Sequence, residues 1–362
     1  MIPRLFEAGT TTFDNYGICP LVDAIACEVT AERNGEYTLT MEYKRDGMWS
    51  EELSVGRIIL ATPYDNASMP EPFDIIKIGY DISENIVVEC EHISYRLNNV
   101  IVGKNEQDPG TRYPAHFWEV ENRYLLTGTN PFTFETDIED ENGTVYKYGC
   151  DVPTSMRSLI GGSERSMLAL YGGELEWNRY KVILHASRGS DNGVKIAYSK
   201  NLTGLNYSAD LTNAITGVIA YWKGNEDYIE GSLQSVTSTF GFNRVAVVDA
   251  SSEFDEKPTA SALNAYASDY LAHHSHLPDV SVEVEFVPLW QTEEYKDFYD
   301  LEHVGLCDIV AVVYPPLNLE LSSQVVKTIY DVLADRYKMI TISSLRKSLA
   351  DTIYTLMKEI SS

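Results

Sequence analysis

Apolar and polar residues alternate across residues 25–43, and this alternation limits the fold more than any other feature of the chain. The second half of the stretch places four apolar residues between polar ones: Tyr37, Leu39, Met41 and Tyr43. Alternate side chains of a strand point to opposite faces, so this period of two is typical of a half-buried strand. Asn34-Gly35 stands in the middle and tolerates the positive φ angles of a tight turn. The stretch therefore predicts a β-hairpin.

The same signature continues along much of the chain. Short strand patterns at 57–61, 73–78 and 86–90 make residues 1–105 one predicted antiparallel β domain, of a tube-like kind on the resemblance described below. Residues 174–342 form a second predicted β region, with strands at 180–184, 194–198, 280–286, 308–314, 324–332 and 339–342. A helical insert near 255–278 interrupts it, because Pro258 precedes a helical apolar face.

Residues 106–173 predict an α+β insertion between the two β regions. A helical pattern covers 114–126, a hairpin is expected around Asn142-Gly143 within 133–148, and a second helix covers 154–171. Thr154 or Ser155 would cap this second helix, and Gly172-Gly173 would stop it. Residues 343–362 predict a C-terminal helix or linker, whose apolar spacing fits a short coiled-coil seam as well as an ordinary amphipathic helix. The fold class is mainly β with α+β insertions.

Composition excludes several classes of protein. A length of 362 residues corresponds to two or three domains at about 150 residues each. With 28 Lys and Arg against 54 Asp and Glu, the formal net charge is −26, which excludes a broad grip on nucleic-acid phosphates. Such a charge still permits a wall past which nucleic acid slides. An aromatic content of 11% is too high for a disordered acidic chain.

Cysteine usage and the N-terminal sequence favour folding in a reducing compartment. The five cysteines are scattered and odd in number, which predicts reduced and mostly buried thiols. No basic start with an apolar core is found at the N-terminus, and no stretch approaches eighteen apolar residues. We therefore expect synthesis in the cytoplasm, with no signal peptide and no membrane span.

A search for catalytic motifs finds no GxSxG, GxGxxG, Walker or HExxH pattern. His273, His274 and His276 could bind a metal, but their position at the end of a predicted helix favours an interaction with the helix dipole. Ser344 and Lys347 match an SxxK spacing that arises often by chance. Gly161-Gly162-Ser163 resembles a phosphate cradle but is better interpreted as a helix cap.

Two further groups of residues allow a functional and a structural interpretation. The carboxylate pairs Glu174/Glu176 and Glu283/Glu285 could serve a glycosidase, but alternate positions of a strand favour one solvated face. Aromatic residues of the second β region could stack on sugars, or could fill cores or subunit interfaces. They are Trp177, Tyr180, Tyr198, Tyr207, Tyr221 and Trp222. From the residues alone we predict no catalytic, cofactor-binding or metal-binding residue.

Three segments resemble one known family. They are residues 17–43, with PLVDAIACEVTAERNGEYTLTMEY; residues 172–205, with GGELEW, the 188–193 turn and YSKNLTGL; and LEHVGLCD at 301–308 followed by VVKTIYDVL at 325–333. Together they resemble the N-terminal region of phage minor structural proteins of the prophage endopeptidase tail (tail-associated lysin) family. The resemblance runs in order over residues 1–345.

The resemblance implies a baseplate hub in the virion, at the tail tip of a long-tailed phage or a prophage-derived particle. Members of the family form homotrimeric rings in which two tube-like β domains per chain continue the tail tube. The implied partners are a distal tail protein, a tape measure protein and receptor-binding or spike proteins, and DNA passes through during ejection without specific binding. The family's C-terminal peptidase or hydrolase module has no counterpart here, so we expect no enzyme activity and no cofactor.

One alternative stays open at this point. The chain could be a cell-wall carbohydrate-binding or wall-degrading tail protein that uses the aromatic residues or the carboxylate pairs. Trimer formation would favour the hub. Loss of polysaccharide binding on Trp177→Ala or Trp222→Ala would favour the alternative.

Overall fold

The structure is a computed structural model that describes most of the chain. The described residues are 2–65, 67, 69–82, 84–106, 114–139, 149–163, 165–224, 227–238, 240–254, 256–277, 279–287, 289, 303–317 and 319–343. The chain divides into two compact units. Unit 1 comprises Met1–Thr203, Val284–Val310 and Gln324–Thr341, and unit 2 comprises Gly204–Glu283, Ala311–Ser323 and Ile342–Ser362.

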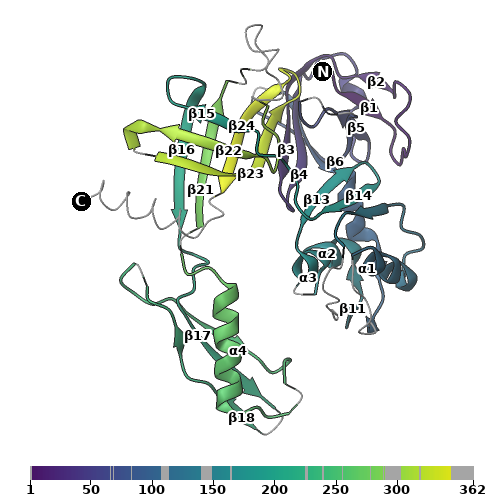
Figure 1. The fold of residues 1–362 in the computed structure, drawn as a ribbon. Coiled ribbons are helices and arrows are strands. Elements are labelled where there is room, and N and C mark those ends of the chain that lie inside the picture. The colour runs from purple at the N-terminus through teal and green to yellow at the C-terminus, as the bar shows by residue number, and fades with distance from the viewer. Residues whose placement is uncertain are drawn as a thin grey trace. The chain divides into compact units, whose positions relative to one another are not determined.

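The N-terminal part of unit 1 is an antiparallel sheet, as the alternation predicts (Figure 1). Its strands are β1 (Arg4–Phe6), β2 (Cys19–Pro20), β3 (Ala24–Glu32), β4 (Tyr37–Tyr43), β5 (Ile58–Ala61), β6 (Glu71–Tyr80) and β7 (Ile86–His92). Two short 3-10 helices, η1 (Ser50–Glu52) and η2 (Ile93–Asn99), follow β4 and β7. Asn34 adopts a φ of 58° in the β3–β4 turn, which confirms the predicted hairpin.

Later strands extend this sheet. They are β15 (Val194–Ala197), β16 (Leu202–Asp210), β21 (Asp279–Phe286), β22 (Ile309–Tyr314), β23 (Leu319–Asp331) and β24 (Arg336–Ser343), and η6 (Pro315–Leu317) precedes β23. Strand β23 pairs antiparallel with β3, with Asp331 opposite Glu28 and Lys327 opposite Glu32. Within the described residues the sheet has 13 strands. A mainly β fold with a large antiparallel sheet is therefore confirmed.

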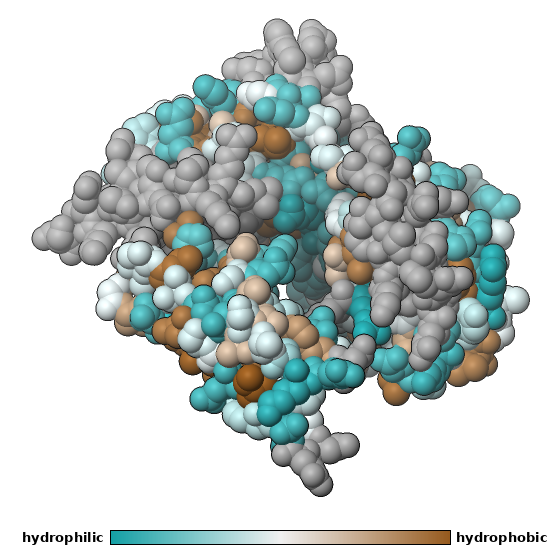
Figure 2. Space-filling model, turned by 60° about the horizontal axis from the view of Figure 1, so that its bottom comes forward, coloured by the Kyte–Doolittle hydropathy of each residue, from teal (hydrophilic) through white to brown (hydrophobic). Residues whose placement is uncertain are grey.

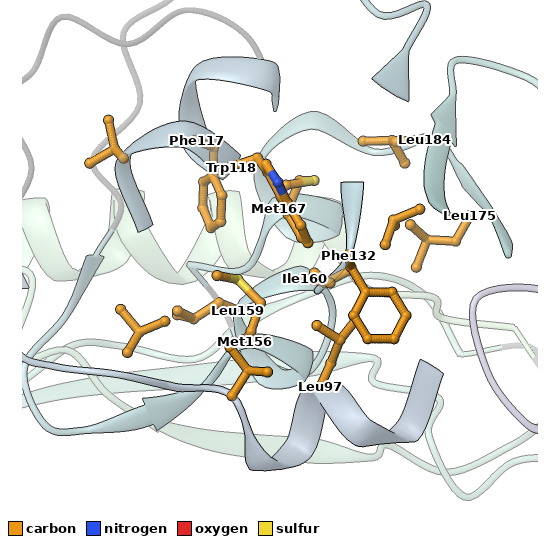
Figure 3. Packing of buried hydrophobic residues seen from close by; sticks show 14 of the residues in the cluster. Leu97, Phe117, Trp118, Phe132, Met156, Leu159, Ile160, Met167, Leu175 and Leu184 are labelled. Atoms are coloured by element: carbon orange, nitrogen blue, oxygen red, sulfur yellow. The ribbon is translucent and has the colours of Figure 1, made fainter. Parts of the chain in front are cut away.

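The insertion is built around a hydrophobic core of its own. Its elements are β8 (Ile101–Val102), β9 (Asn105–Glu106), α1 (Pro114–Glu121), η3 (Asn122–Tyr124), β10 (Thr133–Thr136), β11 (Gly149–Cys150), β12 (Thr154–Ser155), α2 (Met156–Ile160) and α3 (Met167–Tyr171). Figure 3 shows Phe117 and Trp118 of α1 packed near Met156, Leu159 and Met167. Strands β13 (Glu174–Asn178) and β14 (Lys181–His185), which the sequence groups with the second β region, pair with β10 and contribute to the same core.

One sequence prediction for the insertion is wrong. The single helix at 154–171 is two short helices, because the chain leaves helical geometry at Gly161 and α3 begins anew behind its own cap, Ser166. The capping residue Ser155 and the stop at Gly172 are confirmed. Strand β10 pairs in parallel with β14, and Phe134 and Val182 of these two strands both contribute to the core. Residues 140–148, with Asn142-Gly143, lie outside the described residues.

Unit 2 contains a small sheet packed on one helix. Strand β17 (Gly217–Lys223) lies at its centre beside β18 (Tyr228–Glu230), β19 (Gln234–Ser235) and the parallel strand β20 (Val245–Asp249). Helix α4 (Ala260–His273) begins behind the capping side chain of Thr259, close to the predicted start. Val218 and Ala220 pack against Leu263 and Ala267 in the core between them.

Further predictions concern cysteines, membrane spans and the end of the chain. All five cysteines are free and buried, as expected. Among the described residues no helix is long and apolar enough to cross a membrane. Ser343 is the last residue of β24, and the rest of the predicted C-terminal helix lies outside the described residues.

Candidate functional site

The sheet of unit 1 has one buried face and one polar face. Cys27, Val29, Leu39, Met41 and Val88 point into the core and are fully buried. The residues between them point the other way, because the side-chain direction alternates along each strand. The strand registers align Asp331, Glu28, Thr40, Glu89 and Lys77 in one row across β23, β3, β4, β7 and β6.

Carboxylates outnumber cations on this polar face. A second row aligns Ile329, Thr30, Thr38, Glu91 and Asp74. Two carboxylates of the first row form ion pairs with lysines: Glu89 with Lys77 of the same row and Glu28 with Lys338, each at 2.6 Å. Arg96 holds Asp74 through two hydrogen bonds of 2.7 and 2.6 Å. Figure 2 shows hydrophilic residues over much of the visible surface, with hydrophobic residues in separate patches. The polar face is thus an ordered, acidic surface.

A junction within unit 1 joins the β3–β4 hairpin to β13. The Asn34 side chain donates from Nδ2 to the carbonyl of Gly173 at 2.9 Å and accepts from the amide of Leu175 at 2.7 Å. Arg33 lies 3.5 Å from Glu174, and its guanidinium also donates to the side chain of Gln324 on β23. Gln324 in turn donates to Glu174 at 2.8 Å. Side chains of both β regions therefore share one buried polar network.

A tight turn completes the junction. Gly189 has a φ of 80°, and a Cβ atom there would lie 2.2 Å from the carbonyl oxygen of Cys307. The amides of Ser190 and Gly305 donate to the two carboxylate oxygens of Asp308, at 2.8 and 2.6 Å. Only glycine allows the two backbones to approach so closely. The three segments that carry the family resemblance thus contact one another here.

A cavity of about 430 Å³ opens at this junction and is called the junction cavity below. Its walls combine aromatic and charged residues from five parts of unit 1. Those used below are Glu32, Tyr37, Tyr64, Asp65, Trp177, Arg188 and Asp308. A volume above about 300 Å³ is typical of ligand sites.

The insertion holds a buried carboxyl group. Glu121 is 0% exposed, and Asn105 donates to its Oε2 at 2.9 Å. Its Oε1 has no hydrogen-bond partner among the described residues. Burial raises the pKa of Glu121 to about 7, against a smaller lowering by Asn105. Burial is the main cause of the raised pKa of the Cys150 thiol, and the charge of Glu121 raises this pKa further.

The histidine cluster lies at the C-terminal end of α4. His273 ends α4, and its Nδ1 lies 2.8 Å from the carbonyl of Asp269. His274 makes the same contact with Tyr270 at 2.8 Å and stacks on its ring. A ring nitrogen that faces a carbonyl carries the proton, so only Nε2 of each ring keeps a lone pair. Among the described residues no group of three His, Cys, Asp or Glu side chains could hold a metal ion.

The carboxylate pairs differ from each other. Glu283 and Glu285 keep solvent contact on β21, as predicted. The predicted solvated face is wrong for Glu174, which is 9% exposed and accepts from the Arg188 amide at 2.7 Å as well as from Gln324. Polar partners from distant segments compensate its burial, and these could not be inferred from strand spacing. Glu176 contacts His185 at 2.8 Å.

Three of the six aromatic residues pack in or against hydrophobic cores. Trp177 and Tyr180 pack against the core of the insertion, whereas Trp222 is buried in the core beneath α4. Trp222 donates to the carbonyl of Phe254 at 3.0 Å. Tyr198 is 54% exposed, and the side chain of Tyr207 lies outside the described residues. The structural interpretation of Trp177, Tyr180 and Trp222 is confirmed.

Two other motifs remain, the glycine-rich segment at 161–163 and the SxxK spacing. Gly161-Gly162-Ser163 forms the break between α2 and α3, where the Ser163 carbonyl accepts from Ser166 at 3.0 Å. Ser344 and Lys347 lie outside the described residues. Sequence reasoning missed the junction cavity, since its walls come from segments that only the fold brings together.

Comparisons with known proteins agree on the fold. The structure is similar to prophage tail protein gp18 from Listeria monocytogenes EGD-e, with 13% identity and a TM-score of 0.55 over 99% of this chain and 100% of that one. It is also similar to the 43 kDa tail protein of prophage MuSo2 from Shewanella oneidensis, with 11% identity and a TM-score of 0.61 over 97% and 100%. A third similar structure is the tail protein from Neisseria meningitidis MC58, with 8% identity and a TM-score of 0.58 over 96% of this chain and 97% of that one. No curated protein matches the sequence.

The fold is thus similar to that of prophage tail proteins. Residues 190–353 match the model of the prophage endopeptidase tail family, which confirms the family resemblance over this part of the chain. The matched range contains the 188–193 turn from Ser190 onward and strands β15 to β24.

Proposed function

We propose that the chain is a baseplate hub: a homotrimeric ring at the tail tip that continues the tail tube and lets DNA pass. The observation that carries this proposal is the polar face, where two rows of aligned residues across five strands hold five carboxylates above a fully buried core. Three copies that turn this face inward would line a channel with negative charge. Such a wall repels the phosphates of duplex DNA, so DNA can pass along it without being bound.

The ring would contact other proteins of the tail tip. The family resemblance supports a distal tail protein, a tape measure protein and receptor-binding or spike proteins as partners. A conduit needs no substrate and no reacting group, so the proposed role is structural and without catalysis. Three of the aromatic residues on which the carbohydrate-binding alternative relies, Trp177, Tyr180 and Trp222, pack in or against hydrophobic cores instead.

Distances between spin labels test which face lines the channel. Thr40 is exposed in the centre of the carboxylate row, and Glu119 is exposed on α1. All five native cysteines are buried, so cysteines introduced as Thr40→Cys or Glu119→Cys can be labelled selectively. In a trimer the account predicts shorter distances between protomers at position 40 than at position 119. Longer distances at position 40 would show that the polar face points outward and would refute the channel.

A further inference from the structure

We propose that the junction cavity binds an arginine side chain presented by a protein partner. This inference goes beyond the hub, since it concerns a site within unit 1 of a single chain and does not require a ring. Its ligand follows from the charge, the aromatic walls and the volume of the cavity.

The charge of the walls favours a cationic ligand. Glu32, Asp65 and Asp308 line the cavity as carboxylates, and a fourth, Glu36, contacts Lys327 at 3.1 Å. Arg188 is the one guanidinium in the described part of the lining; its Nη1 donates to the Leu175 carbonyl at 3.1 Å, and its Nε lies 4.0 Å from the Glu176 carboxylate. Burial raises the pKa of the Tyr64 phenol most; the Glu176 carboxylate raises it further, and the Arg188 guanidinium lowers it. A cation entering the cavity would meet mostly negative charge.

The aromatic walls favour a planar cation. Tyr37, Tyr64 and Trp177 line the cavity, and guanidinium groups stack on aromatic faces more readily than ammonium groups do. The same kind of interaction occurs at a neighbouring cavity of the chain. The guanidinium carbon of Arg157 lies 4.3 Å from the ring centroid of Tyr95 and 4.9 Å from that of Trp177. Arg157 and both rings line a neighbouring cavity of about 270 Å³.

Volume and position favour a peptide over a free small cation. About 430 Å³ accommodates a long side chain together with adjoining backbone. Polar wall groups such as Ser190 and Asn192 can form hydrogen bonds with such a backbone. The ligand is therefore an arginine within an extended segment of another protein.

Titration of the full-length protein with three probes tests this proposal, with tryptophan fluorescence as the readout because Trp177 lines the cavity. The probes are acetyl-Gly-Arg-Gly-amide, the same peptide with citrulline in place of arginine, and argininamide. Citrulline has nearly the shape of arginine but no charge. We expect the arginine peptide to bind with a Kd on the order of 1 mM, and the citrulline peptide at least about fivefold more weakly.

Variants locate the binding. Glu32→Gln with Asp65→Asn removes two carboxylates from the cavity and should weaken the arginine peptide about threefold or more. Glu51→Gln with Glu119→Gln removes two exposed carboxylates outside the lining and should leave binding unchanged. Equal binding of the two peptides, or equal weakening by the two double variants, would overturn the proposal. So would no binding at all, or argininamide binding as tightly as the peptide, which would indicate a site for small cations.

Discussion

At the scale of single residues, the buried carboxyl of Glu121 couples the insertion to pH. Its folded-state pKa of about 7 lies above the ordinary value of 4.5, so the folded chain holds a proton that the unfolded chain releases. The contribution of Glu121 to the unfolding free energy is therefore fully present below about pH 4.5, and it is lost as the pH rises towards and through 7. The full difference corresponds to about 3 kcal/mol.

Urea unfolding at pH 5 and pH 8 measures this coupling. The unfolding free energy of the insertion should be lower at pH 8, and Glu121→Gln should remove most of the difference because glutamine does not titrate. Glu119→Gln, on the exposed side of the same helix, should keep it. An unchanged pH dependence in Glu121→Gln would contradict this assignment.

The glycine of the 188–193 turn is the second test at this scale. Gly189→Ala would place a Cβ atom 2.2 Å from the Cys307 carbonyl and would strain a φ of 80°, so we expect a loss of roughly 3 kcal/mol in unfolding free energy. Gly193→Ala is the matched control: its φ is 71°, but the space around it is open, so only the strain of about 1–2 kcal/mol applies. Equal losses in the two variants would mean that the close approach at Gly189 has no energetic weight.

At the scale of elements, the Asn34 side chain links the β3–β4 hairpin to β13 through two hydrogen bonds. Asn34→Gly keeps the positive φ of the turn but removes both hydrogen bonds, to Gly173 and from Leu175. Because the Leu175 amide then loses its partner, we expect a loss of about 1–3 kcal/mol. Asn34→Asp retains only the hydrogen-bond acceptor, so its unfolding free energy in a denaturant titration should lie between those of Asn34→Gly and the wild type. A glycine variant as stable as wild type would show that backbone contacts suffice.

Element types could be predicted from the sequence where the pattern is local. The alternation of 25–43, the cap at Ser155 and the stop at Gly172 depend on neighbouring residues, and the structure contains each of them. The break of the predicted 154–171 helix and the parallel pairing of β10 with β14 depend on which residues the core can accommodate. That information is spread over residues far apart in the chain.

The same distinction applies to the candidate site. The polar face could be anticipated as the polar half of each strand pattern, because a period of two fixes which residues share a face. The order of the strands fixes which carboxylates align, and the pairing of β23 with β3 joins residues about 300 positions apart. Glu174 shows the limit most clearly, since its burial depends on Gln324 and Arg188.

At the scale of the whole molecule, the account depends on a ring. Absolute mass by light scattering over a range of protein concentrations, with electron microscopy of the same fraction, tests this most directly. The account predicts a mass three times 40.7 kDa and hollow rings in the images. A mass of 40.7 kDa that persists at every concentration and in the presence of the neighbouring tail proteins would contradict it.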